Sequence, residues 1–152
     1  MKTVAKEFSR ELDLFNRYLK ERDLKLTAQR ALILEVFLGH RGHISAEELY
    51  QKAREKQGHV GFATVYRTLK HMTQCGVARE LDFGDGRFKY EPEYSRQHHD
   101  HMICTRCGSY IEFLNPRIEE LQEQVSRKHG FRITSHQMQL FGLCQKCQKA
   151  EK

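Results

Sequence analysis

The sequence lacks any long apolar segment. Its longest uninterrupted apolar run extends only from Ala31 to Leu34, whereas a helix needs about 20 apolar residues to span a bilayer. The N-terminus mixes basic and acidic residues without an apolar block, so no signal peptide is visible. Internal repeats and low-complexity tracts are also missing. These absences argue against a membrane or repeat protein, and we expect a cytoplasmic location.

Acidic charge is in short supply in the first part of the chain. Residues 1–90 carry 17 Lys/Arg against 12 Asp/Glu, whereas residues 91–152 carry 9 against 8. The total of 152 residues allows one ordinary domain or two small ones. A basic first part is typical of proteins with a polyanionic partner such as DNA, although a merely solvated basic surface has the same composition.

Helix signals dominate the first part. Phe8, Leu12, Phe15 and Leu19 recur four, three and four residues apart, which is the spacing of one face of an amphipathic helix. Caps and glycine terminators mark further helices, among them a capping box formed by the serine and the second glutamate of "SAEEL". The four expected helices cover approximately residues 5–23, 27–39, 45–58 and 62–76.

The pattern then changes to strands. "VARELDF" (77–83) is strand-like, "GDG" (84–86) predicts a tight turn, and "RFKYE" (87–91) returns as a second strand. Helices followed by a β-hairpin predict a winged helix-turn-helix, a common DNA-binding architecture in which the last helix enters the major groove.

The remainder predicts a second, small α+β unit after a linker at residues 91–98. Two short strands should flank a CxxC turn, and Asn115 and Pro116 should begin a helix that ends at Gly130. A long strand is expected over residues 131–144, with a bulge near Ser135 and His136. A unit of about 60 residues has a thin core and gains from a bound metal or a dimer interface.

Two CxxC pairs predict a structural zinc site. Cys104, Cys107, Cys144 and Cys147 supply four thiolates, and 36 residues separate the pairs. The metal would tie the end of the chain to the first turn of the second unit. Two separate reducible pairs, or exposed thiols, are the alternative. Cys75 stands apart and is interpreted as a small, partly buried residue.

The run "HHDH" (98–101) predicts ligands on two faces of a strand. Successive side chains of a strand point to opposite faces, so His99 and His101 share one face while His98 and Asp100 share the other. Each face needs further donors. His43, Glu91 and Glu112 are available to the first face, and Glu119 and His136 to the second. Mixed histidine and carboxylate sites suit Fe²⁺, Mn²⁺ and Zn²⁺. A hydrated linker with unconnected histidines is the alternative.

Seven motifs together carry a family resemblance. They are "LKLTAQR", "HISAEELY", "GFATVYRTL", "HHDHMICTRCG", "IEF", "KHGFRITSH" and the closing CxxC. In this order and spacing, from Leu24 to Cys147, the chain resembles the ferric uptake regulator (Fur) family of metal-dependent transcription factors. The resemblance implies a homodimer, with an N-terminal winged-helix DNA-binding domain (1–90), a hinge (91–98) and a small α/β metal-binding dimerisation domain (99–152).

The resemblance also implies roles for individual residues. It implies a regulatory metal site of His43, Glu91, His99 and His101, with Glu112 as an added ligand; an additional metal site of His98, Asp100, Glu119 and His136; a structural zinc site of the four paired cysteines; and DNA contacts by Lys25, Tyr66 and Arg67. The spacing from Glu91 to His101 is one residue longer than in some members. Glu93 is therefore an alternative to Glu91.

The implied activity is that of a metal-responsive regulator, chiefly a repressor, that binds operator DNA as a homodimer when the regulatory site holds Fe²⁺. Mn²⁺ or Zn²⁺ could replace Fe²⁺ in vitro. A peroxide, zinc or manganese sensor of the same family is the main alternative. A thiol redox enzyme or a zinc-storage protein is disfavoured, because no thioredoxin-like βαβ unit surrounds either CxxC and storage requires no DNA-binding surface. We therefore expect no enzymatic activity.

Overall fold

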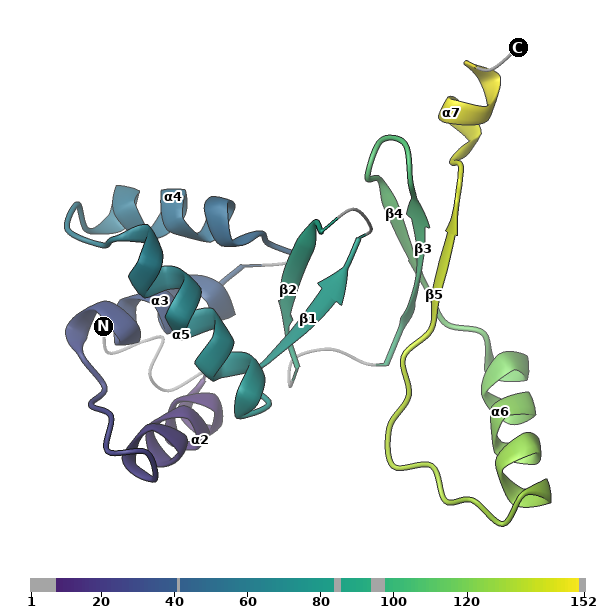
Figure 1. Ribbon diagram of the computed structural model, residues 1–152, viewed down its shortest axis with the longest axis horizontal. Coiled ribbons are helices and arrows are strands. Elements are labelled where there is room, and N and C mark those ends of the chain that lie inside the picture. The colour runs from purple at the N-terminus through teal and green to yellow at the C-terminus, as the bar shows by residue number, and fades with distance from the viewer. Residues whose placement is uncertain (1–7, 41, 84–85, 94–97, 151–152) are drawn as a thin grey trace. The chain divides into compact units, whose positions relative to one another are not determined.

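The structure is a computed structural model that describes residues 8–40, 42–83, 86–93 and 98–150. It divides the chain into two compact units, residues 1–96 and 97–152 (Figure 1). Among the described helices, none has both the length and the apolar character needed to cross a membrane.

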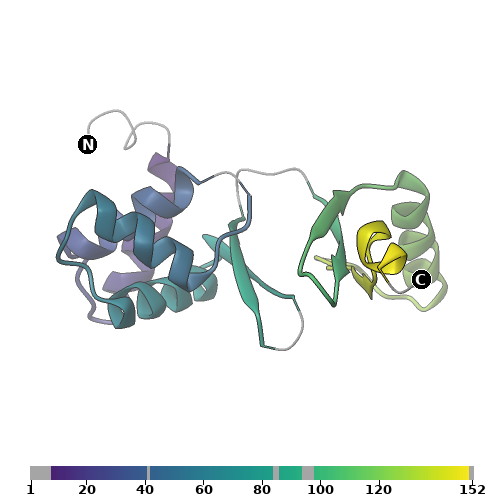
Figure 2. The ribbon, with the colours of Figure 1, turned by 90° about the horizontal axis from the view of Figure 1, so that it is seen from above.

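The first unit has the order predicted for a winged helix. Its helices are α2 (Ser9–Lys20), α3 (Ala28–Leu38), α4 (Ala46–Lys56) and α5 (Phe62–Gln74), followed by strands β1 (Ala78–Asp82) and β2 (Phe88–Pro92). The two strands run antiparallel, side by side, as Figure 2 shows. The tight turn expected at 84–86 lies mostly outside the described residues. Strand β2 includes residues 91 and 92, which open the segment predicted as a hinge.

Local capping explains where α3 and α4 begin. The Thr27 side chain accepts a hydrogen bond from the Arg30 amide at 3.3 Å. At α4, the Glu48 amide donates to Ser45 Oγ at 3.1 Å, and the Ser45 amide donates to the Glu48 carboxylate at 2.7 Å. Both caps were predicted from sequence, because these side chains satisfy amide groups that have no partner inside the helix.

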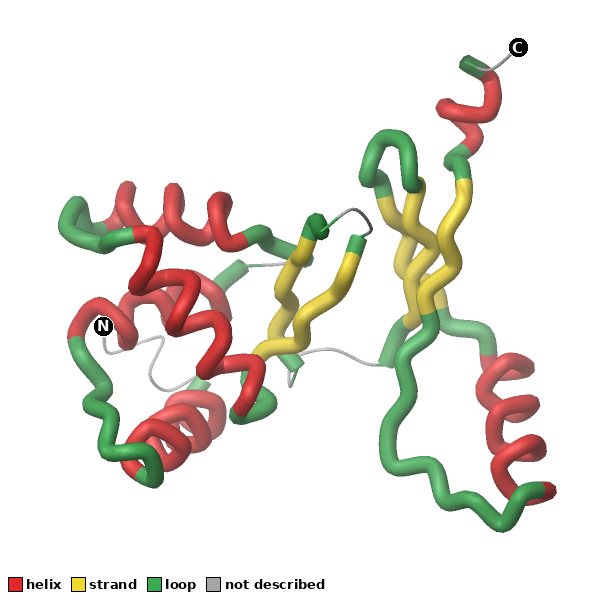
Figure 3. The backbone as a smooth tube through the Cα atoms, in the orientation of Figure 1, coloured by secondary structure: helices red, strands yellow, loops and turns green. Residues whose placement is uncertain are grey.

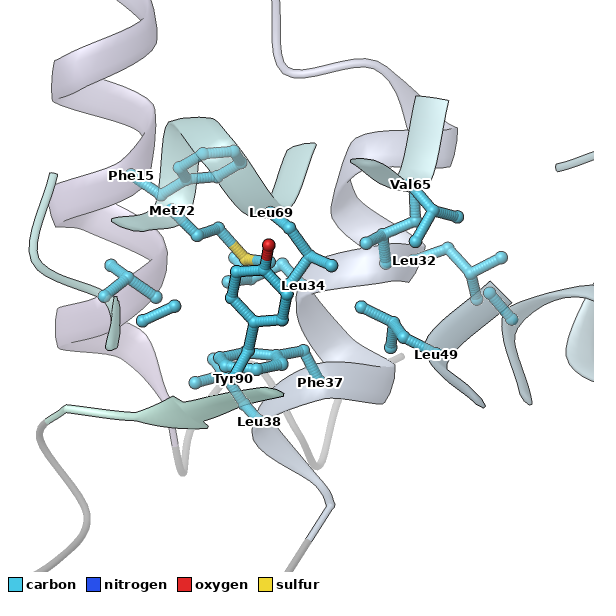
Figure 4. Close-up of a cluster of buried hydrophobic side chains, with 14 of the residues drawn as sticks. Phe15, Leu32, Leu34, Phe37, Leu38, Leu49, Val65, Leu69, Met72 and Tyr90 are labelled. Atoms are coloured by element: carbon cyan, nitrogen blue, oxygen red, sulfur yellow. The ribbon is translucent and has the colours of Figure 1, made fainter. Parts of the chain in front are cut away.

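A buried apolar cluster joins the wing to the helices. Phe37 of α3, Leu69 and Met72 of α5, and Tyr90 of β2 are all almost fully buried and lie together in Figure 4. Ile44 and Tyr90 exchange backbone hydrogen bonds of 2.9 and 2.8 Å. The core therefore fixes the hairpin against the helices and places the residue before Ile44 beside the hairpin.

In the residues that the structure describes, the second unit has a three-stranded sheet and two helices. It contains β3 (Asp100–Cys104), β4 (Tyr110–Phe113), α6 (Pro116–Lys128), β5 (Gln139–Gly142) and α7 (Gln145–Lys149). The strand order is β4-β3-β5, with β3 antiparallel to β4 and parallel to β5. The Asn115 side chain caps α6 at 3.0 Å, as predicted.

The predicted long strand over residues 131–144 is wrong. Only Gln139–Gly142 form a strand, and the chain from the end of α6 to β5 is a loop, drawn green in Figure 3. Strand β5 pairs with residues 101–104 of the short β3, and in the described part of the chain no strand pairing includes residues 131–138. The short helix α7, which begins after Cys144 and contains Cys147, was not predicted.

The second unit leaves much apolar surface exposed. Its buried apolar residues, in the part that the structure describes, are Ile103, Cys104 and Cys147. Ile111, Met102 and Leu140 are register partners on β4, β3 and β5 and form a row across one face of the sheet. They are 58%, 39% and 48% exposed. Such a row is costly to leave in water and marks a contact surface.

Candidate metal centres

The four paired cysteines converge in the second unit. Their four Sγ atoms all lie within 4.8 Å of one another, and Cys107 Sγ is 3.7 Å from Cys144 Sγ. Tetrahedral zinc with Zn–S bonds of about 2.3 Å separates its sulfurs by about 3.8 Å. Cys104 ends β3, and Cys144 and Cys147 lie at the start of α7 and within it. The group thus has the donor set and spacing of structural zinc.

The thiols differ in acidity because their surroundings differ. The Cys144 amide donates a hydrogen bond to Cys104 Sγ at 3.3 Å, and chiefly this bond lowers the pKa of Cys104 to about 6. Burial is the main cause that raises the pKa of Cys147 to about 12. The Cys104 sulfur is therefore ready to bind a metal as a thiolate near neutral pH. To bind Cys147, a metal would have to displace the proton of its thiol.

A second group joins β3, α6 and the loop before β5. One ligand atom each from His98, Asp100, Glu119 and His136 lies within 4.8 Å of the others. His136 Nε2 is 3.1 Å from Glu119 Oε2, and His98 Nε2 is 3.4 Å from Asp100 Oδ1. The loop that replaced the predicted long strand thus brings His136 to this group.

Several donor atoms of this second group are buried without hydrogen bonds in the described part of the chain. They are His98 Nε2, both carboxylate oxygens of Asp100, Glu119 Oε1 and His136 Nε2. Buried polar atoms are normally satisfied, because leaving one unpaired costs roughly 1–3 kcal/mol. A cation bound by two imidazoles and two carboxylates would satisfy all of them.

The first unit contributes a buried histidine–carboxylate pair. His43 Nε2 lies 3.2 Å from Glu91 Oε2, and both side chains are buried. The Ile44–Tyr90 bridge explains their proximity, because each residue of the pair is the sequence neighbour of one bridge residue. The His43 ring also packs edge-on against Phe83 at 5.7 Å between centroids.

Glu93, the alternative carboxylate, has a different partner. Its oxygens accept hydrogen bonds of 2.8 and 2.5 Å from Nε and Nη2 of Arg79. Arg79 Nη1 lies farther, at 4.0 Å, from Glu91 Oε1. Glu93 is thus held by a guanidinium, whereas Glu91 faces an imidazole.

In the second unit, His99 and His101 lie on one side of the chain, as strand alternation predicted. Their ring centroids are 4.9 Å apart. His101 is the register partner of Glu112 on β4, so a carboxylate stands directly across from it. Cross-strand partners have side chains within contact distance on the same face. His99, His101 and Glu112 therefore offer two imidazoles and one adjacent carboxylate on this side of the second unit.

The expected DNA-contacting residues lie on exposed parts of the first unit. Tyr66 and Arg67 are exposed on α5, and Lys25 is exposed just before the cap of α3. Sequence reasoning missed Lys70 of α5, whose ammonium group binds Glu80 of β1 at 2.6 Å and lies 5.6 Å from the Tyr66 ring centroid. Only the folded hairpin brings Glu80 to that helix.

Comparison with known proteins identifies the relatives of this chain. The sequence profile of the ferric uptake regulator family matches residues 21–141. The ferric uptake regulation protein of Campylobacter jejuni is 40% identical over 149 residues, which are 95% of this chain and 94% of that protein.

Two solved structures extend the similarity to the fold. One is the Helicobacter pylori ferric uptake regulator, described as having three functional metal-binding sites; its TM-score is 0.81 at 31% identity, over 95% of this chain and 96% of that one. The other, from Vibrio cholerae, reveals a rearrangement of the DNA-binding domains; its TM-score is 0.71 at 39% identity, over 85% and 98%. The chain is a metal-responsive regulator and belongs to the ferric uptake regulator family.

Proposed function

We propose that this chain is a transcriptional repressor of the cytoplasm that binds operator DNA as a homodimer when its regulatory site holds Fe²⁺. The observation that carries the proposal is that one chain combines a winged-helix unit, with Tyr66 and Arg67 exposed on α5, and several metal donor sets. The chain belongs to a family of regulators and not of enzymes, which supports the same function.

The regulatory site takes its ligands from both units. Each half is suited to this role by itself: the first unit holds His43 against Glu91 at 3.2 Å, and the second holds His99 beside His101 with Glu112 across the strand. A metal bound by all five residues favours one arrangement of the units. In a dimer, that arrangement sets the distance between the two reading helices, which must match the spacing of two DNA half-sites.

Glu91, rather than Glu93, is the proposed hinge carboxylate. The Glu93 carboxylate is bidentate on the Arg79 guanidinium, so a metal would have to break two charge-assisted hydrogen bonds to recruit it. Glu91 already lies beside an imidazole that would share the same ion.

Fe²⁺ is the proposed regulatory metal because the donor set mixes imidazoles with carboxylates, which suits Fe²⁺ and Mn²⁺ more than four thiolates would. The peroxide-sensing branch typically has Asp at the two carboxylate positions, whereas this chain has Glu91 and Glu112. A zinc or manganese sensor would use the same ligands. A mobility-shift assay on operator DNA with Fe²⁺, Mn²⁺, Zn²⁺ or a chelator distinguishes these members.

The other two donor sets serve stability and metal affinity. The four cysteines hold structural Zn²⁺, and His98, Asp100, Glu119 and His136 form the additional site. Three functional metal-binding sites in the H. pylori relative support this count. The additional site ties β3 to α6 and to the loop before β5, and so its filling stiffens the second unit.

DNA reading is assigned to three residues of the first unit. The Tyr66 ring can contact a thymine methyl group, and the Arg67 guanidinium can bond a guanine edge. The family resemblance implies that Lys25 contacts the minor groove. The DNA-binding domains of the V. cholerae relative support this role for the first unit.

A second copy of the chain is the proposed occupant of the apolar row of Ile111, Met102 and Leu140. A stable dimer interface has an apolar centre, and the second unit buries too few side chains to be stable by a large margin alone.

We expect one tightly bound Zn²⁺ per chain at the four cysteines. Metal analysis after mild chelation should retain this zinc, whereas Cys104→Ser should lose it and weaken the fold, because structural zinc contributes folding free energy directly. Cys75→Ser is the matched control and should retain zinc. Full zinc retention in the Cys104→Ser, Cys144→Ser double variant would refute the assignment.

Changes on the two faces of β3 should have different effects. His99→Ala and His101→Ala should raise the metal concentration needed for half-maximal operator binding by at least about tenfold, since loss of even an outer-sphere partner costs that much affinity. His98→Ala should mainly lower thermal stability or metal affinity. Metal titrations of DNA binding and thermal melts measure both quantities, and equal effects of all three changes contradict the two-site assignment.

Arg67→Ala should cost roughly 1–3 kcal/mol of operator binding and reduce sequence discrimination, because it removes a base contact. Lys25→Ala should weaken binding and either lower its salt dependence or relax an A·T preference. Titration against operator and scrambled DNA at two salt concentrations measures these effects, with metal affinity in the absence of DNA as the control. If Arg67→Ala binds operator DNA as tightly as the wild-type protein does, then α5 is not the reading helix.

Ile111→Glu should shift the protein from dimer to monomer in sedimentation analysis, because it places a charge in the proposed apolar interface. Gln51→Glu, on the exposed side of α4, adds the same charge and should leave the dimer intact. A dimer that persists in Ile111→Glu at the same concentration contradicts an interface at this row.

A further inference from the structure

The end of α2 and the second half of α5 are joined by an aromatic and polar contact chain. The Tyr18 hydroxyl donates a hydrogen bond to the side-chain oxygen of Gln74. The centroids of the Tyr18 and His71 rings are 5.9 Å apart. On the outer side of this contact, the Arg22 guanidinium stacks on the Tyr18 ring with Cζ 3.9 Å from its centroid. Arg22 is thereby held against the edge of the proposed DNA-reading helix.

The backbone also fixes Arg22. The Leu24 amide bonds the Leu19 carbonyl at 2.9 Å, and the Asp23 amide bonds the Lys20 carbonyl at 3.1 Å. With Asp23 at φ 55°, these bonds form a Schellman motif that follows the last residue of α2, Lys20, and includes Arg22. The Arg22 guanidinium is planar and is held by both the backbone turn and the Tyr18 ring. It therefore loses little conformational freedom when it binds a ligand.

Arg22 is one of three arginines, from different segments of the first unit, whose charges act on His71 of α5. Arg67, His71 and Gln74 share one face of α5, because they are separated by four and three residues. At the start of α3, Arg30 Nη1 bonds the Lys25 carbonyl at 2.6 Å. Burial, followed by the charges of Arg30, Arg22 and Arg67, lowers the pKa of His71. The potential at this edge of α5 is therefore positive.

Nearby acidic groups neutralise Arg22 only weakly. Its nearest carboxylate partner, Glu21, is 3.9 Å away, and both side chains are at least half exposed. Such surface ion pairs contribute little and are readily exchanged for another anion. The guanidinium thus keeps donors for a ligand with negatively charged oxygens.

We propose that Arg22, oriented by the Tyr18 ring, binds a backbone phosphate of the DNA that α5 reads, so that the turn after helix α2 forms part of the DNA interface. This inference rests on the proposed DNA binding by the first unit. The contact is independent of base sequence, because a phosphate carries no sequence information. It adds affinity for any duplex and fixes the position of α5 on it.

Salt dependence separates this role from a purely structural one. Arg22→Gln removes one positive charge from an exposed side chain and should leave thermal stability close to wild type. For each protomer on the DNA, it should reduce the slope of log affinity against log salt by about 0.9. Between about 50 and 200 mM salt, wild type should therefore lose about 3.5-fold more affinity per protomer than the variant. Operator and scrambled DNA should be affected equally.

Three variants complete the test. Arg22→Lys keeps the charge and should keep the wild-type slope, and Arg22→Glu should bind DNA more weakly than Arg22→Gln. Arg127→Gln, on α6 of the second unit, makes the same chemical change and should match wild type. An unchanged slope in Arg22→Gln overturns the proposal, as does a slope in Arg22→Lys as low as that of Arg22→Gln. Failure of wild type itself to bind DNA would instead overturn the proposed function.

Discussion

The alternation of side chains along β3 is the constraint on which the second unit depends. Asp100 points toward the group that includes Glu119 and His136, whereas His101 points to the opposite face and pairs with Glu112. One five-residue strand therefore contributes side chains to two candidate metal groups, and Cys104 at its end contributes to a third. A shift of one residue in its register would exchange the faces and dismantle all three groups at once.

In the first unit, a comparable role falls to the buried Tyr90 on β2. It joins the apolar cluster of α3 and α5, and its backbone pairs with Ile44. The same strand carries Glu91, and the residue before Ile44 is His43. The packing of Tyr90 thus positions both the hairpin beside the helical core and the first-unit ligands of the proposed regulatory site. Core packing and metal chemistry are coupled because they use adjacent residues.

Two other elements of the first unit contact side chains of α5. Lys70 is bound to Glu80 of the hairpin, and Gln74 and His71 contact Tyr18 of α2, on which Arg22 stacks. These contacts fix the second half of α5, which follows Tyr66 and Arg67 along the helix.

The sequence alone determined the helices of the first unit, its hairpin, the caps at Thr27, Ser45 and Asn115, and the division of the HHDH run between two faces. These features follow from local periodicity and from side chains that bond nearby backbone groups. Tertiary structure decided what sequence-local rules cannot reach. The segment before β5 became a loop because β3 is too short to pair with it, and that loop carries His136 to Glu119. Likewise, the hairpin register places Glu91 opposite Arg79, yet the Arg79 guanidinium donates its hydrogen bonds to Glu93. Glu91 instead faces His43, because the Ile44–Tyr90 bridge brings two segments far apart in sequence together.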